Sequence, residues 1–354
     1  MKAAFIGLPG SGKSTLFGAV TGTRPDPYAA PQVHRLVVKV PDARLGFLTR
    51  LYQPKKVTEA SVEFLDVPGF SLGDPAGVSE FKKVLPDIRQ ADVLAVVVRD
   101  FDSADIPSYK NRVDAPADFA EVWSELIFAD LDSVSTRIER LHRSLQKPSK
   151  THDHDQHELK LLERCRATLE AEKPLSCVLD APEERKQLAS FAFLTEKPLV
   201  VVRNVSESRI REPAAELSRH ARYNLTLCAS AEEEIALLPP EDRAPFLADL
   251  GIEQPARDRL IRSCHEAAGV ICFLTMGPDE VRAWEIPRGS SALEAAARIH
   301  SDLARGFIRA ETVSYEDLKT HDDLKGARAA GKVRQEGKAY IVQDGDILNI
   351  KFNV

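Results

Sequence analysis

The chain has 354 residues, of which 43% are hydrophobic and 29% charged, a composition typical of a soluble globular protein with two or three domains. The net charge of -6 argues against a broad nucleic-acid-binding surface, although it leaves room for a local basic patch. No apolar run approaches the ~20 residues that span a bilayer, and the apolar start of the chain predicts a strand, not a signal peptide. Five scattered cysteines without a C-x-x-C pair indicate reduced thiols, so we expect a cytoplasmic protein.

A phosphate-binding loop is predicted near the beginning of the chain. Residues 3–6 form an apolar run that predicts a buried strand, and a helix follows from residue 15 until Gly22. The segment between them fits G-x-x-x-x-G-K-[ST], with Gly7, Pro9, Gly10, Ser11, Gly12, Lys13, Ser14 and Thr15 as nucleotide-binding residues. Glycines let successive backbone N–H groups point at phosphate oxygens, and the helix N-terminus adds its positive dipole end. We therefore predict that this loop binds a nucleoside triphosphate. A glycine-rich turn that binds nothing is the alternative.

Three residues are predicted to be catalytic, namely Lys13, Asp66 and Gly69. Lys13 would reach the β- and γ-phosphates, while the Ser14 hydroxyl would be a ligand of Mg²⁺. Residues 61–65 predict a strand that ends in Asp66-Val67-Pro68-Gly69, and an acidic residue after an apolar strand is the Walker B arrangement. Asp66 would then hold Mg²⁺ through water, and Gly69 would offer its N–H to the γ-phosphate. Alone, D-x-x-G usually marks a turn, but its place after the loop favours the metal site.

Further strands are predicted on both sides of a helical segment. Three prolines between residues 23 and 31 prevent regular structure, so we place the first switch loop there. The β-branched run at 93–98 favours a strand buried on both faces of a parallel sheet. The remaining strands of this part are predicted at 36–40, 199–202 and 225–228.

The helical segment has the pattern of a coiled-coil hairpin. Apolar residues recur at steps of four and three, which is a heptad seam, at Ile127, Leu131, Val134, Ile138, Leu141 and Leu145. A polar turn at 147–150 precedes a second helical run with Leu159, Leu162 and Leu169 on one face, ending by Pro174. Two ordinary surface helices are the alternative. Three nearby histidines, His152, His154 and His157, are expected to be solvated and not metal ligands.

The C-terminal part predicts a small β-grasp domain. Strands are expected at 281–286, 339–342 and 347–352, with a turn at 343–346 joining the last two. The helix expected at 290–299 has Ser290 as a possible N-cap. The predicted domains are 1–121 (first part of the nucleotide-binding domain), 122–174 (helical insertion), 175–271 (second part) and 272–354 (β-grasp).

Taken in order, these motifs resemble the YchF subfamily of Obg-related translation-factor GTPases, over the whole chain. The P-loop, Asp66 to Gly69, Asn204 to Glu207 and Ser230-Ala231 stand where related GTPases carry their nucleotide motifs. The segments most similar to the family's TGS domain are 280–284, 299–302, 305–310 and 343–346. The resemblance implies an α/β fold: a P-loop NTPase domain with a mostly parallel sheet, an inserted antiparallel coiled-coil hairpin and a C-terminal β-grasp (TGS) domain.

The resemblance also implies which residues meet the base, namely Asn204, Val205, Glu207, Ser230 and Ala231. A guanine-specific site has Lys where this chain has Val205 and Asp where it has Glu207. The extra methylene of Glu207 displaces the carboxylate and spoils its paired hydrogen bonds to guanine, whereas the N6 amine of adenine could bond to Asn204. We predict that ATP binds at least as well as GTP. In the alternative, this stretch is a loop without a base contact.

Some positions depart from the family pattern. Where this chain has Gly10, the family usually has Asn, a residue linked to a potassium site. The family also usually has a Mg²⁺-binding Thr at the place that falls near Ala30, and commonly has Ala where this chain has Pro68. Phe70 stands where Ras-like enzymes have a water-orienting Gln, and phenylalanine cannot hydrogen-bond water, so we predict slow intrinsic hydrolysis.

We therefore predict a monomeric, ribosome-linked regulatory NTPase that uses Mg²⁺ and hydrolyses ATP, with GTP as a second substrate. The ribosome or ribosomal RNA is the expected partner, and no membrane is involved. A small-molecule kinase and a non-hydrolysing interaction protein are the alternatives.

Overall fold

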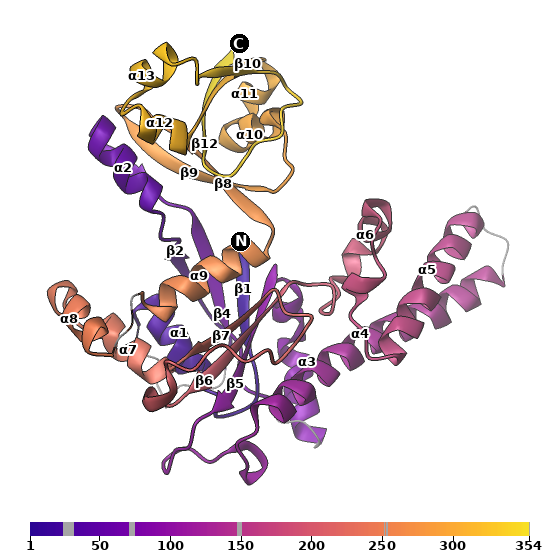
Figure 1. Ribbon diagram of the computed structural model, residues 1–354. Coiled ribbons are helices and arrows are strands. Elements are labelled where there is room, and N and C mark those ends of the chain that lie inside the picture. Colours follow the sequence, from indigo (N-terminus) through magenta and orange to yellow (C-terminus); the bar gives the residue numbers. More distant parts are fainter. Residues whose placement is uncertain (24–31, 71–74, 147–150, 251, 253, 354) are drawn as a thin grey trace. The chain divides into compact units, whose positions relative to one another are not determined.

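The computed structural model describes residues 1–23, 32–70, 75–146, 151–250, 252 and 254–353. They divide into two compact units (Figure 1). Unit 1 comprises Met1–Leu36 and Glu63–Leu260, and unit 2 comprises Val37–Val62 and Ile261–Val354. The predicted first switch loop, including Ala30, lies outside the described residues from residue 24 onwards.

Unit 1 is built on a six-stranded sheet in the order β2-β4-β1-β5-β6-β7. The pairings of β1 with β4 and β5, of β5 with β6 and of β6 with β7 are parallel, which confirms the predicted mostly parallel sheet. The strands are β1 (Lys2–Ile6), β2 (His34–Lys39), β4 (Ser61–Asp66), β5 (Val93–Asp100), β6 (Leu199–Val205) and β7 (Tyr223–Leu227). Because parallel strands share one carboxyl edge, the residues that follow β1, β4, β5 and β6 meet there, where ligands of such sheets bind.

The chain between and after these strands is mainly helical. The helices are α1 (Lys13–Thr21), α3 (Pro75–Arg89), α4 (Ala115–Leu145), α5 (His152–Glu170), α6 (Pro182–Leu188), α7 (Ala229–Leu237), α8 (Pro240–Leu250) and α9 (Ala256–Ala267). Single 3₁₀ turns are η1 (Tyr109–Asn111), η2 (Leu175–Cys177), η3 (Ala189–Phe191) and η4 (Glu207–Arg209). Within the described ranges, none of the helices combines the length and the apolar character required to cross a bilayer.

The helices α4 and α5 lie side by side as a hairpin (Figure 1). Four residues of the predicted heptad seam are buried, and Leu131 packs partly buried against them. The second helix contributes Leu162 and Leu169 as predicted, and also Leu161 and Cys165, which single-face periodicity did not single out. The seam therefore holds the two arms together, while residues 147–150 of the predicted turn lie outside the described residues.

A buried ion pair joins the hairpin to α3. The Arg89 guanidinium, at the end of α3, lies 3.0 Å from the fully buried Asp130 carboxylate of α4 and also donates to the carbonyls of Phe191 and Ala192. Asp130 in turn accepts hydrogen bonds from the backbone N–H groups of Leu194 and Thr195. Burial raises the pKa of Asp130, and its partners oppose that rise. The pair thus ties three chain segments at one point.

Replacing Arg89 with methionine should lower the free energy of unfolding of unit 1 by about 3 kcal/mol, because it leaves a buried carboxylate without its cation. The matched control is Lys83→Met on the same helix, whose exposed pair with Glu80 should matter by less than about 1 kcal/mol. Urea unfolding followed by Trp123 fluorescence, with Trp284 of unit 2 replaced by Phe in all proteins, reports on unit 1. Equal losses in the two variants would contradict the prediction.

Unit 2 contains a second six-stranded sheet in the order β11-β10-β12-β8-β9-β3. The strands are β3 (Lys56–Thr58), β8 (Val270–Thr275), β9 (Glu280–Pro287), β10 (Phe307–Ser314), β11 (Arg334–Glu336) and β12 (Asp346–Phe352). The helices are α2 (Ala43–Tyr52), α10 (Ala292–Ile299), α11 (Ser301–Arg305), α12 (Tyr315–Thr320) and α13 (Leu324–Ala329). The side chains of α10 pack on Phe273, Ile286 and Leu348 of the sheet.

Two local predictions for unit 2 were wrong. Residues 339–342 form no strand but a single bridge between Ser291 and Ile341, and the antiparallel partner of β12 is β10. The N-cap of α10 is Ser291 and not Ser290, since the Ser291 hydroxyl accepts from Glu294 N and the Glu294 carboxylate accepts from Ser291 N. That reciprocal pair is a capping box.

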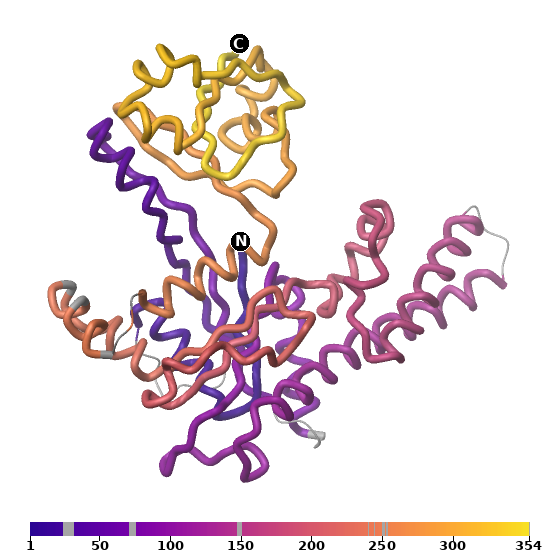
Figure 2. The backbone as a smooth tube through the Cα atoms, in the orientation of Figure 1, coloured from indigo at the N-terminus to yellow at the C-terminus, as the bar shows by residue number. Residues whose placement is uncertain are grey.

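The structure also groups the chain differently from the four predicted ranges. The segment 37–62 belongs to unit 2, together with the C-terminal segment. The colours of Figure 2 let the reader trace it there. Its strand β3 pairs in parallel with β9, and its Arg44 bridges Asp42 and Asp344 at 2.8 and 2.7 Å. The pairing of β3 with β9 and the contact of Arg44 with Asp344 join residues more than two hundred positions apart, so local sequence patterns do not reveal them.

Candidate functional site

The loop between β1 and α1 has a backbone that only glycine tolerates. Gly10 and Gly12 have φ values of 71° and 90°, in the left-handed region. A Cβ atom on Gly7 would lie 2.3 Å from the Val97 carbonyl oxygen, and one on Gly12 would lie 2.2 Å from Asn204 Nδ2. Since Gly12 is also the residue that precedes α1, the loop leads directly into a helix N-terminus. This is the strand–loop–helix context that a phosphate-binding loop requires.

Lys13 and Gly69 lie together beside this loop. The Lys13 ammonium is 5% exposed and donates to the Leu8 carbonyl at 2.9 Å. Desolvation by burial lowers the pKa of Lys13 to about 8, against the opposing effect of Asp66. A Cβ on Gly69 would lie 2.9 Å from Pro9 Cα and 3.0 Å from Lys13 Nζ, so the backbone of the D-x-P-G turn closely approaches the loop.

The lowered pKa of Lys13 makes triphosphate affinity pH-dependent. Below pH 8 the ammonium is charged and ready to bind phosphate, whereas above it binding must first take up a proton. We expect the affinity for MgATP to fall by up to about ten-fold per pH unit above pH 8. Calorimetry between pH 7.5 and 9.5, in buffers of different ionisation enthalpy, measures both the affinity and the proton uptake. A flat profile without uptake would contradict the assigned pKa.

Ser14 and Asp66 have the chemistry of a Mg²⁺ site. Asp66 ends β4 and is 5% exposed, and burial raises its pKa while a hydrogen bond from Ser14 and the charge of Lys13 lower it. Its Oδ1 atom is buried without a hydrogen-bond partner among the described residues, as is the Ser11 hydroxyl. A carboxylate and a hydroxyl are the hard oxygen ligands that Mg²⁺ prefers, and a buried orphan oxygen calls for a partner. These residues therefore fit the ion.

Asn204 connects the loop with the start of α7. Its Nδ2 donates to the Ser11 carbonyl at 3.0 Å, and its Oδ1 accepts from Ala229 N at 2.9 Å. From the sequence we predicted that this side chain could bond to the N6 amine of adenine. Instead, both ends of the amide bond to the protein, and the side chain is 4% exposed. Asn204 thus sets the distance between the phosphate loop and the segment expected to meet the base.

The other predicted base-binding residues differ in exposure. Val205 ends β6 and is 1% exposed, whereas Glu207 begins η4 and is exposed. Ser230 is exposed and Ala231 buried, both in the first turn of α7, and Ser230 Oγ lies 3.1 Å from Cys228 Sγ. The structure therefore leaves Glu207 and Ser230 accessible to a ligand.

Arg99 is a residue of the site that the sequence analysis missed. It is 3% exposed on β5, and its guanidinium donates to the carbonyls of Phe101, Ile106 and Pro107 at 3.0, 3.0 and 3.2 Å. A Cβ on Gly10 would lie 3.2 Å from the Pro107 carbonyl oxygen, so Arg99 folds the loop after β5 against the phosphate loop. The sequence signal that could have revealed Arg99 is a charged residue directly after a β-branched run. An arginine buried at the end of such a strand needs hydrogen-bond acceptors nearby.

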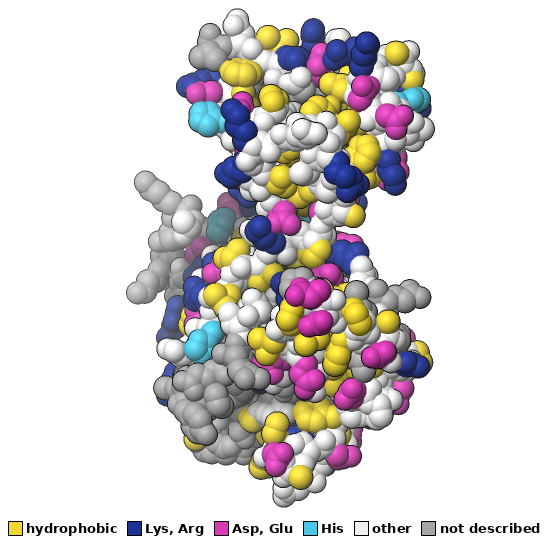
Figure 3. Space-filling model, turned by 90° about the vertical axis from the view of Figure 1, so that its left-hand side faces the viewer, with side chains coloured by type: hydrophobic (Ala, Val, Ile, Leu, Met, Phe, Trp, Pro, Cys, Tyr) yellow, Lys and Arg dark blue, Asp and Glu magenta, His cyan; other side chains and the backbone are white. Residues whose placement is uncertain are grey.

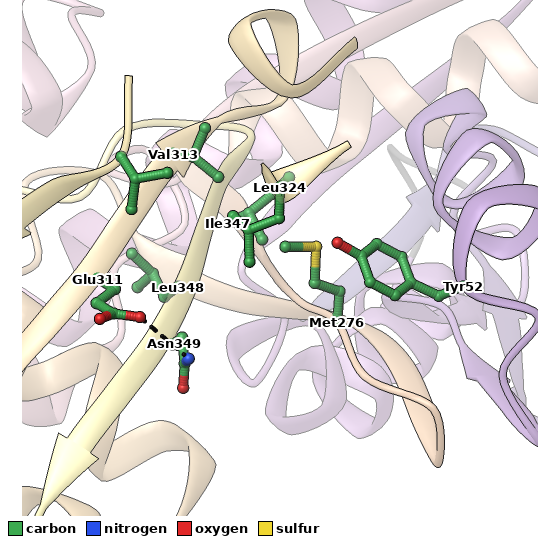
Figure 4. A pocket seen from close by; sticks show the side chains of 9 residues that line it. Tyr52, Met276, Glu311, Val313, Leu324, Ile347, Leu348 and Asn349 are labelled. Carbon is green, nitrogen blue, oxygen red and sulfur yellow. Dashed lines mark hydrogen bonds between the residues drawn. The ribbon is translucent and has the colours of Figure 1, made fainter. Parts of the chain in front are cut away.

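Two other features involve none of the residues of the phosphate loop. His154, Asp155 and Glu158 have ligand atoms within 4.8 Å, but Glu158 pairs with Arg137 at 2.7 Å and Asp155 accepts from Ser144, so the carboxylates serve the hairpin. Unit 2 has an apolar pocket of about 80 Å³ (Figure 4). It contains no predicted site residue, and its lining includes Tyr52, Met276, Val313, Leu324 and Ile347.

Comparisons with known proteins agree with this geometry. Residues 2–128 match the model described as "50S ribosome-binding GTPase", and residues 270–353 match YchF-GTPase_C, described as a protein of unknown function. The chain is 39% identical to "Ribosome-binding ATPase YchF" of Bacillus subtilis (strain 168) and 38% identical to that of Haemophilus influenzae, covering 100% of this chain and 100% and 99% of theirs. The structure of the Schizosaccharomyces pombe YchF GTPase matches with a TM-score of 0.84 and 27% identity, over 99% of this chain and 97% of that one. The chain belongs to the YchF family.

Proposed function

We propose that this protein is a ribosome-associated, Mg²⁺-dependent NTPase that hydrolyses ATP slowly, with GTP as a second substrate. The observation that carries the proposal is the cluster of Lys13, Ser14, Asp66 and Gly69 around a loop that only glycines can form. The bacterial relatives are named ribosome-binding ATPases, whereas the yeast structure is named a GTPase, so the nucleotide itself is part of the proposal.

The side chains around the loop suggest how the chemistry is divided. Lys13 would exchange its bond to the Leu8 carbonyl for the β- and γ-phosphate oxygens, and Gly69 would donate its N–H to the γ-phosphate. Ser14 and Asp66 would hold Mg²⁺, which neutralises charge on the phosphates. Phe70 is 1% exposed and packs on Phe81 with ring centroids 4.5 Å apart, so it faces the core and offers the attacking water nothing. We therefore expect slow hydrolysis by the protein alone, and faster hydrolysis when a partner orders the switch loops.

Purine preference tests the part assigned to the base. We expect ATP to bind at least as well as GTP, since the longer Glu207 side chain cannot pair with guanine as aspartate does. Glu207→Asp should shift the preference toward GTP by about ten-fold, the value of one recovered polar pair. Calorimetry with both nucleotides and Mg²⁺ measures it, with Glu234→Asp on α7 as the control. A clear GTP preference in the wild type would contradict the proposal.

The proposed partner is the ribosome. The protein would bind it through the hairpin and unit 2, and would do so as a cytoplasmic monomer. Arg140 and Arg143 are exposed on the first arm of the hairpin. In unit 2 Lys and Arg outnumber Asp and Glu, although the whole chain is acidic. Figure 3 shows Lys and Arg side chains spread over the face of unit 2 that it presents. Contacts to RNA phosphates weaken steeply with salt. Co-sedimentation with ribosomes at low salt, lost at high salt, is the expected result; no co-sedimentation in any nucleotide state would contradict the proposal.

A further inference from the structure

Four charged side chains form a closed network at the carboxyl ends of β5 and β6. Asp100 is the last residue of β5, and Arg203 lies on the neighbouring β6. Arg203 Nε donates to Asp100 at 2.5 Å and Arg203 Nη2 to Glu212 at 2.9 Å. Arg209 closes the network, because it bonds to the same two carboxylates. Each acid therefore faces two cations and each cation two acids.

Arg209 uses its whole guanidinium in these contacts. Nη1 and Nη2 lie 3.1 and 3.2 Å from the two Asp100 carboxylate oxygens, and Nη1 also donates to the Asp100 carbonyl at 3.2 Å. Nε and Nη2 donate to Glu212 at 2.7 and 3.0 Å. Only the planar fork of arginine can serve two carboxylates in this way, since lysine is a point charge.

The network anchors the segment that carries Glu207. Arg209 ends η4, which Glu207 begins, and the Arg209 N–H donates to the Ser206 carbonyl at 3.0 Å. At the other end of the segment, Asn204 is fixed to Ser11 and Ala229. Residues 204–209 are thus held at both ends, with Val205 buried and Glu207 exposed between the anchors.

We propose that Arg209, together with Asp100 and Glu212, is a positioning group that fixes Glu207 for recognition of the purine. The inference rests on the proposed function, in which residues 204–207 meet the base. A side chain that discriminates between bases must be held within about 0.5 Å of its working position, and a segment ordered beforehand loses less entropy on binding. Arg209 does not touch the nucleotide; it acts through the segment.

The test compares full-length wild type with Arg209→Met by calorimetry, using MgATP, MgGTP and Mg-tripolyphosphate. Tripolyphosphate has no base, so it reports on the phosphate loop alone. In Arg209→Met the Glu207 carboxylate, which would accept from the N6 amine of adenine but cannot pair with guanine, is no longer held in place. We therefore expect ATP affinity to fall about ten-fold while GTP changes by less than about three-fold, with tripolyphosphate unchanged. Arg209→Lys should lie between wild type and Arg209→Met. The control is Arg164→Met, which removes an ion pair between α5 of the hairpin and Glu184 of α6 and should change none of the three affinities.

Three results would overturn the inference. An equal loss for ATP and tripolyphosphate would make Arg209 a support of the phosphate loop. Unchanged affinities in Arg209→Met would make the network irrelevant to the ligand. A wild type that binds ATP and GTP equally would leave the segment without a purine to select, although the proposed triphosphate binding would stand. By contrast, a wild type that binds neither triphosphate nor tripolyphosphate would refute the proposed function itself.

Discussion

Replacing Lys13 with alanine should abolish tight triphosphate binding, with a loss of about a hundred-fold or more. Lys13 is the single cationic side chain of the loop from residue 7 to 15, and charge-assisted hydrogen bonds to phosphate are the strong ones. The protein should stay folded, because the buried ammonium donates to the Leu8 carbonyl alone among the described residues and desolvation already disfavours its charge. Calorimetry with MgATP measures the loss, and the thermal unfolding temperature checks the fold.

The control for Lys13 is Lys83→Ala, which removes an exposed ammonium from the same unit and should leave the affinity unchanged. Equal affinities of wild type and Lys13→Ala would contradict the assignment of the phosphate loop. A variant that no longer folds would contradict the expectation that the fold does not depend on the Lys13 side chain.

Replacing Asn204 with alanine should have the second-largest effect on the site. It leaves the Ser11 carbonyl and the Ala229 N–H without their partner in a buried place, at a cost of roughly 1–3 kcal/mol for each group. Since the two groups belong to the phosphate loop and to the start of α7, we expect weaker binding of ATP and of tripolyphosphate, each by about a hundred-fold at most.

Asn204→Asp separates the two bonds, because a carboxylate can still accept from Ala229 N but cannot donate to Ser11. We expect it to bind as weakly as Asn204→Ala or more weakly, owing to repulsion from the Ser11 carbonyl. Asn349→Ala in unit 2, where the amide makes a 3.4 Å contact with Glu311, is the matched control. Loss of ATP affinity without loss of tripolyphosphate affinity would contradict the bridging role and favour a direct contact with the base.

Local patterns were enough to predict the parts of the fold that depend on local physics. The β-branched run at 93–98 became the buried strand β5, and the heptads became the seam of the hairpin. The phosphate loop was predictable because the spacing of its glycines, Lys13 and Ser14 is a local pattern. Each of these features is encoded within one continuous stretch of the sequence.

Features that depend on distant contacts could not be predicted. The strand β12 pairs with β10 and β8, not with the adjacent residues 339–342, and β3 joins a sheet whose other strands follow two hundred residues later. The bridge made by Asn204 likewise exists only after the sheet brings β1, β5 and β6 together. The motifs predicted the right region of the chain, but the roles of individual side chains became clear only from the tertiary structure.

The most direct test of the account is phosphate release from ATP by the full-length protein, with and without ribosomes. The account predicts slow release by the protein alone, faster release with ribosomes, and none above background for Lys13→Ala in either condition. Release by Lys13→Ala equal to that of the wild type, or no release from ATP with ribosomes present, would contradict it.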